Sequence, residues 1–184
     1  MSITYLIVPG YTNSGPEHWQ SYMERKYSNV VRVQQENWNS PVRNAWVNNL
    51  NKTIENTQGD LFLIGHSCGA VTIAQWSFQH ENSRVKGALL VAPADVDAED
   101  TIPEIKVQRP LPLLKQLPFP ATMICSDNDK YLSLEKAHLL ARIWGTSLKI
   151  IRGAGHLNTA VGYGEWEEGE KLINELSGGN LVVR

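Results

Sequence analysis

The sequence has 184 residues, of which 42% are hydrophobic and 20% charged, and its formal net charge is −2 at pH 7. This length and composition fit a single globular domain, residues 1–184, that can bury a full core without disulfides or a metal. The small net charge gives no electrostatic reason to expect a nucleic acid or an anionic membrane as partner.

The cysteines and the N-terminal residues indicate in which cellular compartment the protein is expected. One pair, Cys68 and Cys125, does not make a disulfide framework in a chain of this length, so reduced thiols are expected. The apolar run at the start has no basic segment before it, and Pro9 and Gly10 end it too early for a signal peptide or a membrane span. We therefore expect a cytoplasmic protein.

Short apolar runs alternate with helical patterns along the chain. Most of the runs are continuously apolar, as in strands covered on both faces of a parallel sheet. In chain order we expect a strand at 3–8, a helix at 17–27, a strand at 30–33, a helix at 41–57, a strand at 61–64, a helix at 70–78, strands at 86–92 and 121–125, a helix at 134–144, a strand at 147–151 and a helix at 167–176. This order predicts an α/β fold with a mostly parallel six-stranded sheet and helices on both faces.

Residues 93–120 break this alternation. They contain six prolines and only a weak helical pattern. We interpret them as an irregular excursion over the strand ends, not as a second domain.

The strongest chemical signal is the pentapeptide Gly-His-Ser-Cys-Gly at 65–69, which joins a predicted strand to a predicted helix. A Gly-x-Ser-x-Gly turn in this setting holds its serine in strained backbone geometry, with the hydroxyl above the sheet. The glycines leave space where a Cβ would press on the neighbouring strand or helix. The backbone N–H of Cys68 can point at a developing oxyanion. Ser67 is therefore the candidate nucleophile, and the alternative is an ordinary N-cap serine.

A serine hydroxyl needs a base, and five histidines are available. His156 lies in a glycine-rich loop directly after the last predicted strand, so it is expected at the same edge of the sheet as Ser67. Imidazole titrates near neutrality and can take the serine proton and return it. His66 adjoins the serine, but neighbours in such a turn point apart. His80 and His138 lie on or beside predicted helices.

The third group should be a carboxylate that follows an intervening strand. The fifth predicted strand is followed by Asp127 and Asp129. The local pattern does not separate them, because either could be a turn-forming residue. Asp95, Asp97 and Asp100, which follow the fourth strand, are weaker candidates.

The loop after the first strand is the expected source of a second oxyanion donor. Gly10 permits a close backbone approach there, and the N–H of either Tyr11 or Thr12 could reach the site. The histidines and cysteines lack metal-ligand spacing, and no phosphate-binding glycine motif is present. We therefore expect neither a metal nor a nucleotide cofactor.

Three further residues could rim a pocket beside the serine: His18, Trp19 and Trp38. The alternative for the two tryptophans is a packing role in the core.

Several unusual strings extend over nearly the whole chain. They lie at 8–10, 14–20, 34–38, 65–69, 89–93, 117–120, 126–129, 153–158 and 162–166. With these strings the sequence resembles the small α/β-hydrolase family that includes retinoblastoma-binding protein nine and the bacterial YdeN-type proteins. The resemblance implies a compact α/β-hydrolase fold without a large lid. It also implies a catalytic triad of Ser67, Asp129 and His156, and so favours Asp129 over Asp127.

The same resemblance implies a serine hydrolase that cleaves small ester bonds, or amide bonds, through an acyl-enzyme on Ser67. Cys68 and Lys130 stand where such bacterial proteins often have Leu and Pro, and neither change removes a catalytic group. The retinoblastoma-binding property is not implied, since the chain has no L-x-C-x-E string. The alternatives are an acyltransferase or thioesterase on the same triad, or a binding protein that retains the fold. The expected assembly is a monomer or a homodimer.

Overall fold

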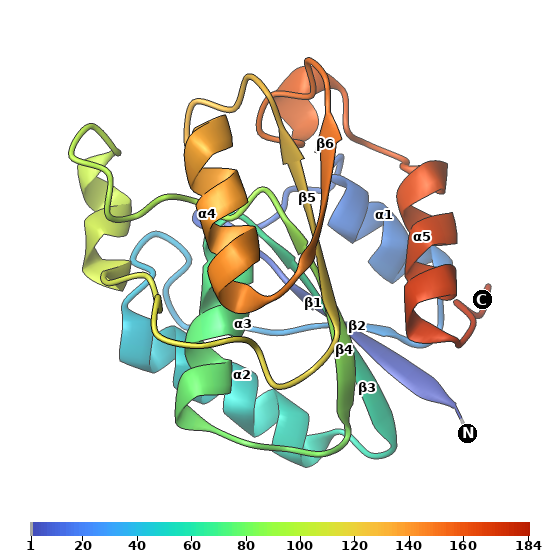
Figure 1. Cartoon of the computed structure of the whole chain (residues 1–184). Helices are drawn as coiled ribbons and strands as arrows, with labels where there is room; N and C mark the ends of the chain where they lie inside the picture. Colours follow the sequence, from blue (N-terminus) through green and yellow to red (C-terminus); the bar gives the residue numbers. More distant parts are fainter. Residues whose placement is uncertain (1) are drawn as a thin grey trace.

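A six-stranded, all-parallel sheet forms the centre of the computed structural model, which describes residues 2–184 (Figure 1). The strand order is β2-β1-β3-β4-β5-β6. The strands are β1 (Ile3–Val8), β2 (Val30–Arg32), β3 (Asp60–His66), β4 (Val85–Val91), β5 (Ala121–Ser126) and β6 (Ser147–Ile151).

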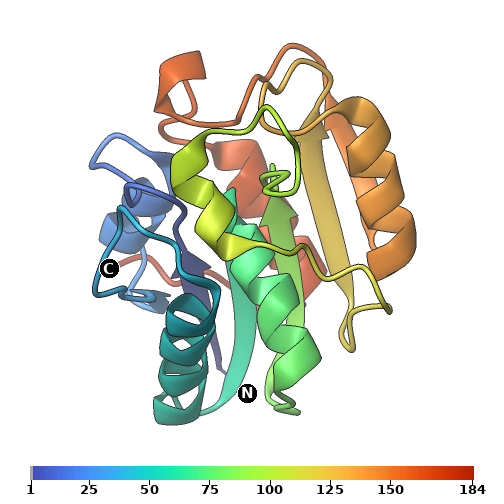
Figure 2. The same cartoon turned by 90° about the vertical axis from the view of Figure 1, so that its left-hand side faces the viewer.

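Helices cover both faces of this sheet. Figure 2 looks onto the face covered by α2, α3 and α4, whereas α1 and α5 lie behind it. The helices are α1 (Trp19–Lys26), α2 (Arg43–Asn56), α3 (Cys68–Gln79), α4 (Leu134–Trp144) and α5 (Glu167–Ser177). The predicted fold and all eleven predicted elements are confirmed, with bounds that agree to within two residues.

The two helical layers explain why the strands are continuously apolar. Along β1, Leu6 and Val8 belong to the core beneath α2, α3 and α4, whereas Tyr5 and Ile7 belong to the core beneath α1 and α5. All four side chains are fully buried. A strand covered on both faces has no solvent-facing side, and so the sequence shows no alternation of polar residues.

The strand order reverses at β1, which pairs with β2 on one side and β3 on the other. The carboxyl ends of β1 and β3 lie side by side, because Val8 is in register with Gly65. Ligands of open α/β sheets bind outside the carboxyl ends of the strands at such a reversal. The fold therefore brings the loop after β1 next to the turn that contains Ser67.

Residues 93–120 contain the short 3₁₀ helix η1 (Pro103–Gln108), which is attached to α3 by buried glutamines. The Nε2 of Gln108 donates to the carbonyl of Cys68 over 2.8 Å and to the Thr72 hydroxyl over 3.0 Å. The Nε2 of Gln75 donates to the Gln108 carbonyl over 2.7 Å. This excursion is packed on the body of the protein, and no separate lid domain stands over the sheet within residues 2–184.

The helices in the described part of the chain are short. The longest, α2, has 14 residues, and none has the length and apolar composition needed to cross a bilayer.

The start of α3 lies directly against the end of β1, and glycine makes this contact possible. A Cβ on Gly69 would overlap the carbonyl oxygen of Val8 and come within 2.7 Å of that of Pro9. A Cβ on Gly65 would come within 2.7 Å of the Cα of Ala70. At Gly69 the obstructing atoms all belong to the backbone, so no rotation of a side chain can relieve that clash.

Replacement of Gly69 by alanine is therefore expected to lower the free energy of unfolding by about 3 kcal/mol or more, because two backbone segments must separate. Urea unfolding followed by circular dichroism measures this loss. Gly15→Ala is the matched control, since a Cβ at Gly15 meets nothing within 4 Å and its φ is not positive. Equal losses in the two variants would contradict the packing argument.

Candidate active site

Ser67 lies between β3 and α3 with φ 57° and ψ −122°. Such a positive φ costs a residue other than glycine about 1–3 kcal/mol, and it persists only where the surroundings hold it. Here the Ser67 N–H donates to the carbonyl of Val91 over 3.0 Å, and the Val71 N–H donates to the carbonyl of Ser67 over 3.2 Å. The strained turn predicted for the pentapeptide is therefore present, with β4 bracing one side and α3 the other.

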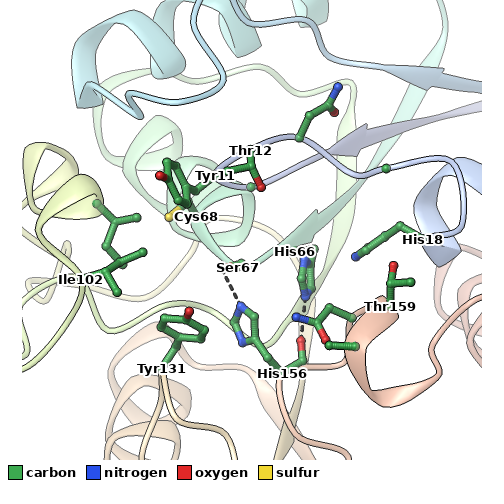
Figure 3. A pocket seen from close by; sticks show the side chains of 16 residues that line it. Tyr11, Thr12, His18, His66, Ser67, Cys68, Ile102, Tyr131, His156 and Thr159 are labelled. Carbon is green, nitrogen blue, oxygen red and sulfur yellow. Dashed lines mark hydrogen bonds between the residues drawn. The ribbon is translucent and has the colours of Figure 1, made fainter.

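Two hydrogen bonds connect Ser67, His156 and Asp129. The Ser67 hydroxyl lies 2.8 Å from the Nε2 of His156, and the Nδ1 of His156 lies 2.8 Å from the Oδ2 of Asp129 (Figure 3 shows the first). The Asp129 side chain is only 1% exposed, and its Oδ1 accepts from the N–H of Tyr131 over 2.8 Å. A carboxylate cannot donate, so Nδ1 carries the ring proton. Nε2 is then free to accept from the serine.

Asp127, the other carboxylate left open by the local pattern, does not contact His156. Its Oδ1 accepts from the N–H of Gly153 over 2.8 Å. The Oδ1 of Asn128 accepts from the N–H of Gly155 over 2.7 Å. Both bonds hold the loop that carries His156, where Gly153 and Gly155 have φ values of 67° and 54°.

His66 holds the same loop from the opposite side, which differs from the expectation that it points away from the site. Its Nε2 lies 2.8 Å from the backbone carbonyl of His156. Its ring stands between His156 and His18, at centroid distances of 4.9 and 4.7 Å (Figure 3). A carbonyl only accepts, so Nε2 carries the proton and donates it. The residue before the nucleophile therefore fixes the backbone of the base.

The loop after β1 packs on the nucleophile turn, where Gly10 makes the close approach predicted for it. A Cβ on Gly10 would lie 3.1 Å from the Cβ of Ser67 and 3.2 Å from the N of Cys68. Of the two candidate donors in this loop, Thr12 is excluded because its N–H already donates to the carbonyl of Trp38 over 2.8 Å. The N–H groups of Cys68 and Tyr11 remain as candidate donors to an oxyanion.

The thiol of Cys68 lies next to these groups. Burial raises the pKa of this thiol to about 12. Cys68 is thus a protonated, buried packing residue at neutral pH.

A cavity of about 380 Å³ opens over Ser67. On one side of the serine it is lined by Ile102 and Tyr131, and on the other by His18 and Thr159 (Figure 3). Ile105, three residues after Ile102, also lines it. No group of three or more His, Cys, Asp or Glu side chains in the described part of the chain is placed to hold a metal ion.

A family profile described as serine hydrolase matches residues 5–175. The chain belongs to the serine hydrolase family. Among curated proteins, none matches the sequence significantly.

Solved structures agree with this family. A YdeN-like hydrolase from Pectobacterium atrosepticum is 30% identical over 96% of this chain and 91% of its own, with a TM-score of 0.87. The ydeN gene product of B. subtilis is 15% identical over 96% of this chain and 98% of its own, with a TM-score of 0.74. Est1E from Butyrivibrio proteoclasticus, solved with ferulic acid, is 12% identical over 96% and 89%, with a TM-score of 0.67. The last two likenesses concern the fold alone.

Of the three residues considered for the pocket of this serine hydrolase, the structure places only His18 at the cavity. Trp19 is 1% exposed, packs edge-on against Trp166, and donates from its indole N–H to the carbonyl of Leu157 over 3.0 Å. Trp38 packs edge-on against Trp46. The pocket assignment is wrong for both tryptophans, because their rings are used to pack the core and, in Trp19, to brace the His156 loop.

Several residues that line the cavity are absent from the sequence-based candidates, among them Tyr131, Ile102 and Ile105. The ring of Tyr131 lies 4.7 Å from that of His156, and Tyr131 follows Asp129 by two positions in an aspartate-capped turn. Ile102 and Ile105 come from the proline-rich excursion. A turn-forming aspartate gives a weak signal for Tyr131, but no local pattern in residues 93–120 shows which apolar side chains face the site.

The imidazoles of His18 and His66 are both neutral. Burial lowers the pKa of His18 to about 3, and the nearby charges of Arg32 and His156 act in the same direction. Burial also holds the pKa of His66 well below its usual value of 6.5, with His156 and His18 as lesser causes.

The contact between Asn128 and Gly155 should matter for the orientation of His156. We expect Asn128→Ala to slow the reaction of Ser67 with a fluorophosphonate about tenfold, the equivalent of one hydrogen bond. The labelling rate is measured by quenching the reaction at a series of times and quantifying the labelled protein on a gel. Asp127→Ala is the control, since Asp127 holds Gly153, three positions before the base, in an exposed bond. It should change the rate by about twofold or less. Wild-type labelling by Asn128→Ala would refute this role.

Because His18 and His66 are neutral in the folded protein, we expect the free energy of unfolding to depend on pH. In the unfolded chain each takes up a proton below its ordinary pKa of about 6.5, whereas the folded chain resists protonation. Their stabilising contribution is therefore complete above pH 6.5 and is lost as the pH falls below it. As the pH falls from 7 to 5.5, protonation of each histidine in the unfolded chain should lower the free energy of unfolding by about 1 kcal/mol.

Urea unfolding at the two pH values measures the loss. His18→Asn should lose about 1 kcal/mol less than the wild type over this interval, because one of the two histidines is gone. Equal losses would show that His18 is not held neutral by the fold.

Proposed function

We propose that this serine hydrolase cleaves small carboxylic esters through an acyl-enzyme on Ser67. The observation that carries the proposal is the pair of 2.8 Å hydrogen bonds from Ser67 to His156 and from His156 to Asp129 at the floor of a cavity. The chain's place in the serine hydrolase family supports it. Amide bonds are a second, less reactive substrate class for the same groups.

In the first step His156 acts as the base. Its Nε2 takes the proton of the Ser67 hydroxyl as the oxygen attacks the ester carbonyl, and the proton then passes to the departing alcohol. The Asp129 carboxylate keeps the ring proton on Nδ1 and stabilises the imidazolium. In the second step water, deprotonated by His156, attacks the acyl-enzyme. The bond from the acyl carbon to the Ser67 oxygen then breaks, His156 returns the proton to that oxygen, and the acid is released.

The carbonyl oxygen becomes negatively charged in both steps. The N–H groups of Cys68 and Tyr11 would stabilise this charge, the first at the N-terminus of α3 and the second across the close contact made by Gly10. Neither group has to be reorganised during the reaction, because the backbone already holds both.

The size of the cavity favours small acyl groups. Its volume of about 380 Å³ lies near the lower end of the range for ligand pockets, and Ile102 and Ile105 bound it on one side. These two side chains supply an apolar wall for a short acyl or alcohol chain.

Fluorophosphonate labelling and turnover of p-nitrophenyl esters test the proposal. Wild type should label and should hydrolyse acetate and butyrate esters faster than long-chain esters. Ser67→Ala should not label and should lose turnover by on the order of 10³-fold or more, as should His156→Ala.

The two neighbouring aspartates provide the matched pair. Asp129→Asn should lower kcat by on the order of 10³-fold, because an amide no longer fixes the tautomer of His156, whereas Asp127→Asn should retain activity within about twofold. A folded wild type without Ser67-dependent turnover would instead indicate a binding protein. Faster turnover of thioesters, or transfer to alcohols or amines in preference to water, would indicate a thioesterase or an acyltransferase.

A further inference from the structure

Besides His156 and His66, a third imidazole lines the cavity, and one of its two ring nitrogens has no hydrogen-bond partner in the described part of the chain. His18 is 5% exposed and lines the cavity over Ser67, and its ring extends from the start of α1 toward His66 with a nitrogen at its leading edge (Figure 3). Its Nε2 is buried and has no hydrogen-bond partner among the described residues. Nearly all buried polar groups have a partner, so an orphaned one at a binding cavity calls for a function.

The role of His18 in α1 determines which of its ring nitrogens carries the proton. His18 is the N-cap residue, and its Nδ1 accepts from the N–H of Gln20 over 3.1 Å. Nδ1 must therefore be unprotonated. Since burial lowers the pKa of His18 to about 3, the ring is neutral at physiological pH and its one proton lies on Nε2. His18 is thus a fixed, uncharged donor.

The lining of the cavity beside this donor is uncharged. Arg32, whose charge acts on His18, is not part of that lining and is paired with Glu24 over 2.7 Å. None of the residues that line the cavity is Asp, Glu, Lys or Arg. The neighbouring His66 ring is held neutral, with its Nε2–H directed to the carbonyl of His156. An anionic group would lose its hydration here without gaining a cation, whereas an ether, carbonyl or hydroxyl oxygen needs only a donor.

We propose that the Nε2–H of His18 is a substrate-binding donor, which selects esters that carry a second, uncharged acceptor oxygen close to the scissile carbonyl. This inference rests on the proposed function and restricts the class of esters that the protein is expected to cleave. It divides the cavity into an apolar side, at Ile102 and Ile105, and a hydrogen-bonding side, at His18.

The substrate oxygen must displace the atoms that cover Nε2 in the unliganded protein. We expect the side chains that move to be those of the short 3₁₀ helix η2 (Thr159–Val161). Its residues Thr159 and Ala160 line the cavity and are exposed at its rim. Thr159 lies beside His18 (Figure 3).

Matched esters that differ by one oxygen test the proposal. On the acyl side these are p-nitrophenyl methoxyacetate and p-nitrophenyl butyrate. On the alcohol side they are 2-methoxyethyl acetate and butyl acetate. For each pair, the ratio of kcat/KM for the ether-containing ester to that for its hydrocarbon partner is measured in wild type and in His18→Asn. Comparison of the ratios cancels the intrinsic reactivity of the esters.

We expect the ratio to fall about fivefold to tenfold in His18→Asn for one of the two pairs, as for the loss of one neutral hydrogen bond. Asparagine retains the N-cap oxygen that α1 needs, so the helix should persist. His138→Asn, an exposed histidine on α4, is the control and should keep the wild-type ratios and activity. Fluorophosphonate labelling of Ser67 in His18→Asn checks that the nucleophile is still assembled.

A second measurement needs no variant at His18. In wild type labelled with ¹⁵N-histidine, the Nε2–H resonance of His18 should move when Ser67 carries a phosphonate with a 2-methoxyethyl chain, and should stay in place with the butyl analogue. Unchanged ester ratios in His18→Asn, or equal resonance positions in the two adducts, would overturn the proposal and leave His18 as a helix cap. A wild type that labels but cleaves none of the four esters would overturn the proposed ester hydrolysis as well.

Discussion

The backbone contact between the end of β1 and the start of α3 is the constraint on which the rest of the site depends. Gly69 lies against the carbonyl oxygens of Val8 and Pro9, and Gly10 lies against Ser67 and Cys68. Because no side chain separates these segments, the N–H groups of Tyr11 and Cys68 come from two different loops to one place. Beside this contact, backbone hydrogen bonds with Val91 of β4 and Val71 of α3 hold Ser67 at a positive φ, with its side chain at the cavity. Strain at the nucleophile is thus balanced by packing in the layer beneath it.

The base is held in a different way, by side chains from distant parts of the chain. The His156 loop contains three residues with positive φ, and it would be poorly defined by itself. Asn128 holds it from the end of β5, His66 from the end of β3, and the Trp19 indole from α1. Each bond goes to a backbone atom of the loop, and the buried side chains of Ala154 and Leu157 anchor the loop in the core. The loop is therefore rigid where the chemistry needs it, although it lies at the edge of the sheet.

The neutrality of His18 and His66 connects binding with stability. Both rings are buried, and both are held in one tautomer by a backbone group: the N–H of Gln20 for His18 and the carbonyl of His156 for His66. Burial of these two imidazoles lowers the free energy of unfolding in acid, because both become protonated in the unfolded chain but not in the folded one. The same burial provides an uncharged hydrogen-bond donor, His18, close to the base His156, which becomes positively charged during the reaction. A cation at His18 or His66 would oppose the imidazolium that forms on His156.

The sequence by itself determined the strands, the helices, the nucleophile turn and the position of His156, because these depend on local patterns: continuous apolar runs, glycine spacing and a loop directly after a strand. Its local pattern did not separate Asp127 from Asp129, since both follow the same strand and both can form turns. The family resemblance favoured Asp129, and the folded chain shows that this carboxylate reaches His156 whereas Asp127 reaches Gly153. Likewise, Tyr11 and Thr12 are neighbours in one loop, and the carbonyl of Trp38, distant in sequence, uses the N–H of Thr12. The inward turn of His66, the burial of Trp19 and the approach of Ile102 and Ile105 were decided by tertiary packing in the same way. The contacts of these side chains are formed between segments that are distant in the sequence and come together only on folding. Local sequence patterns therefore do not predict them.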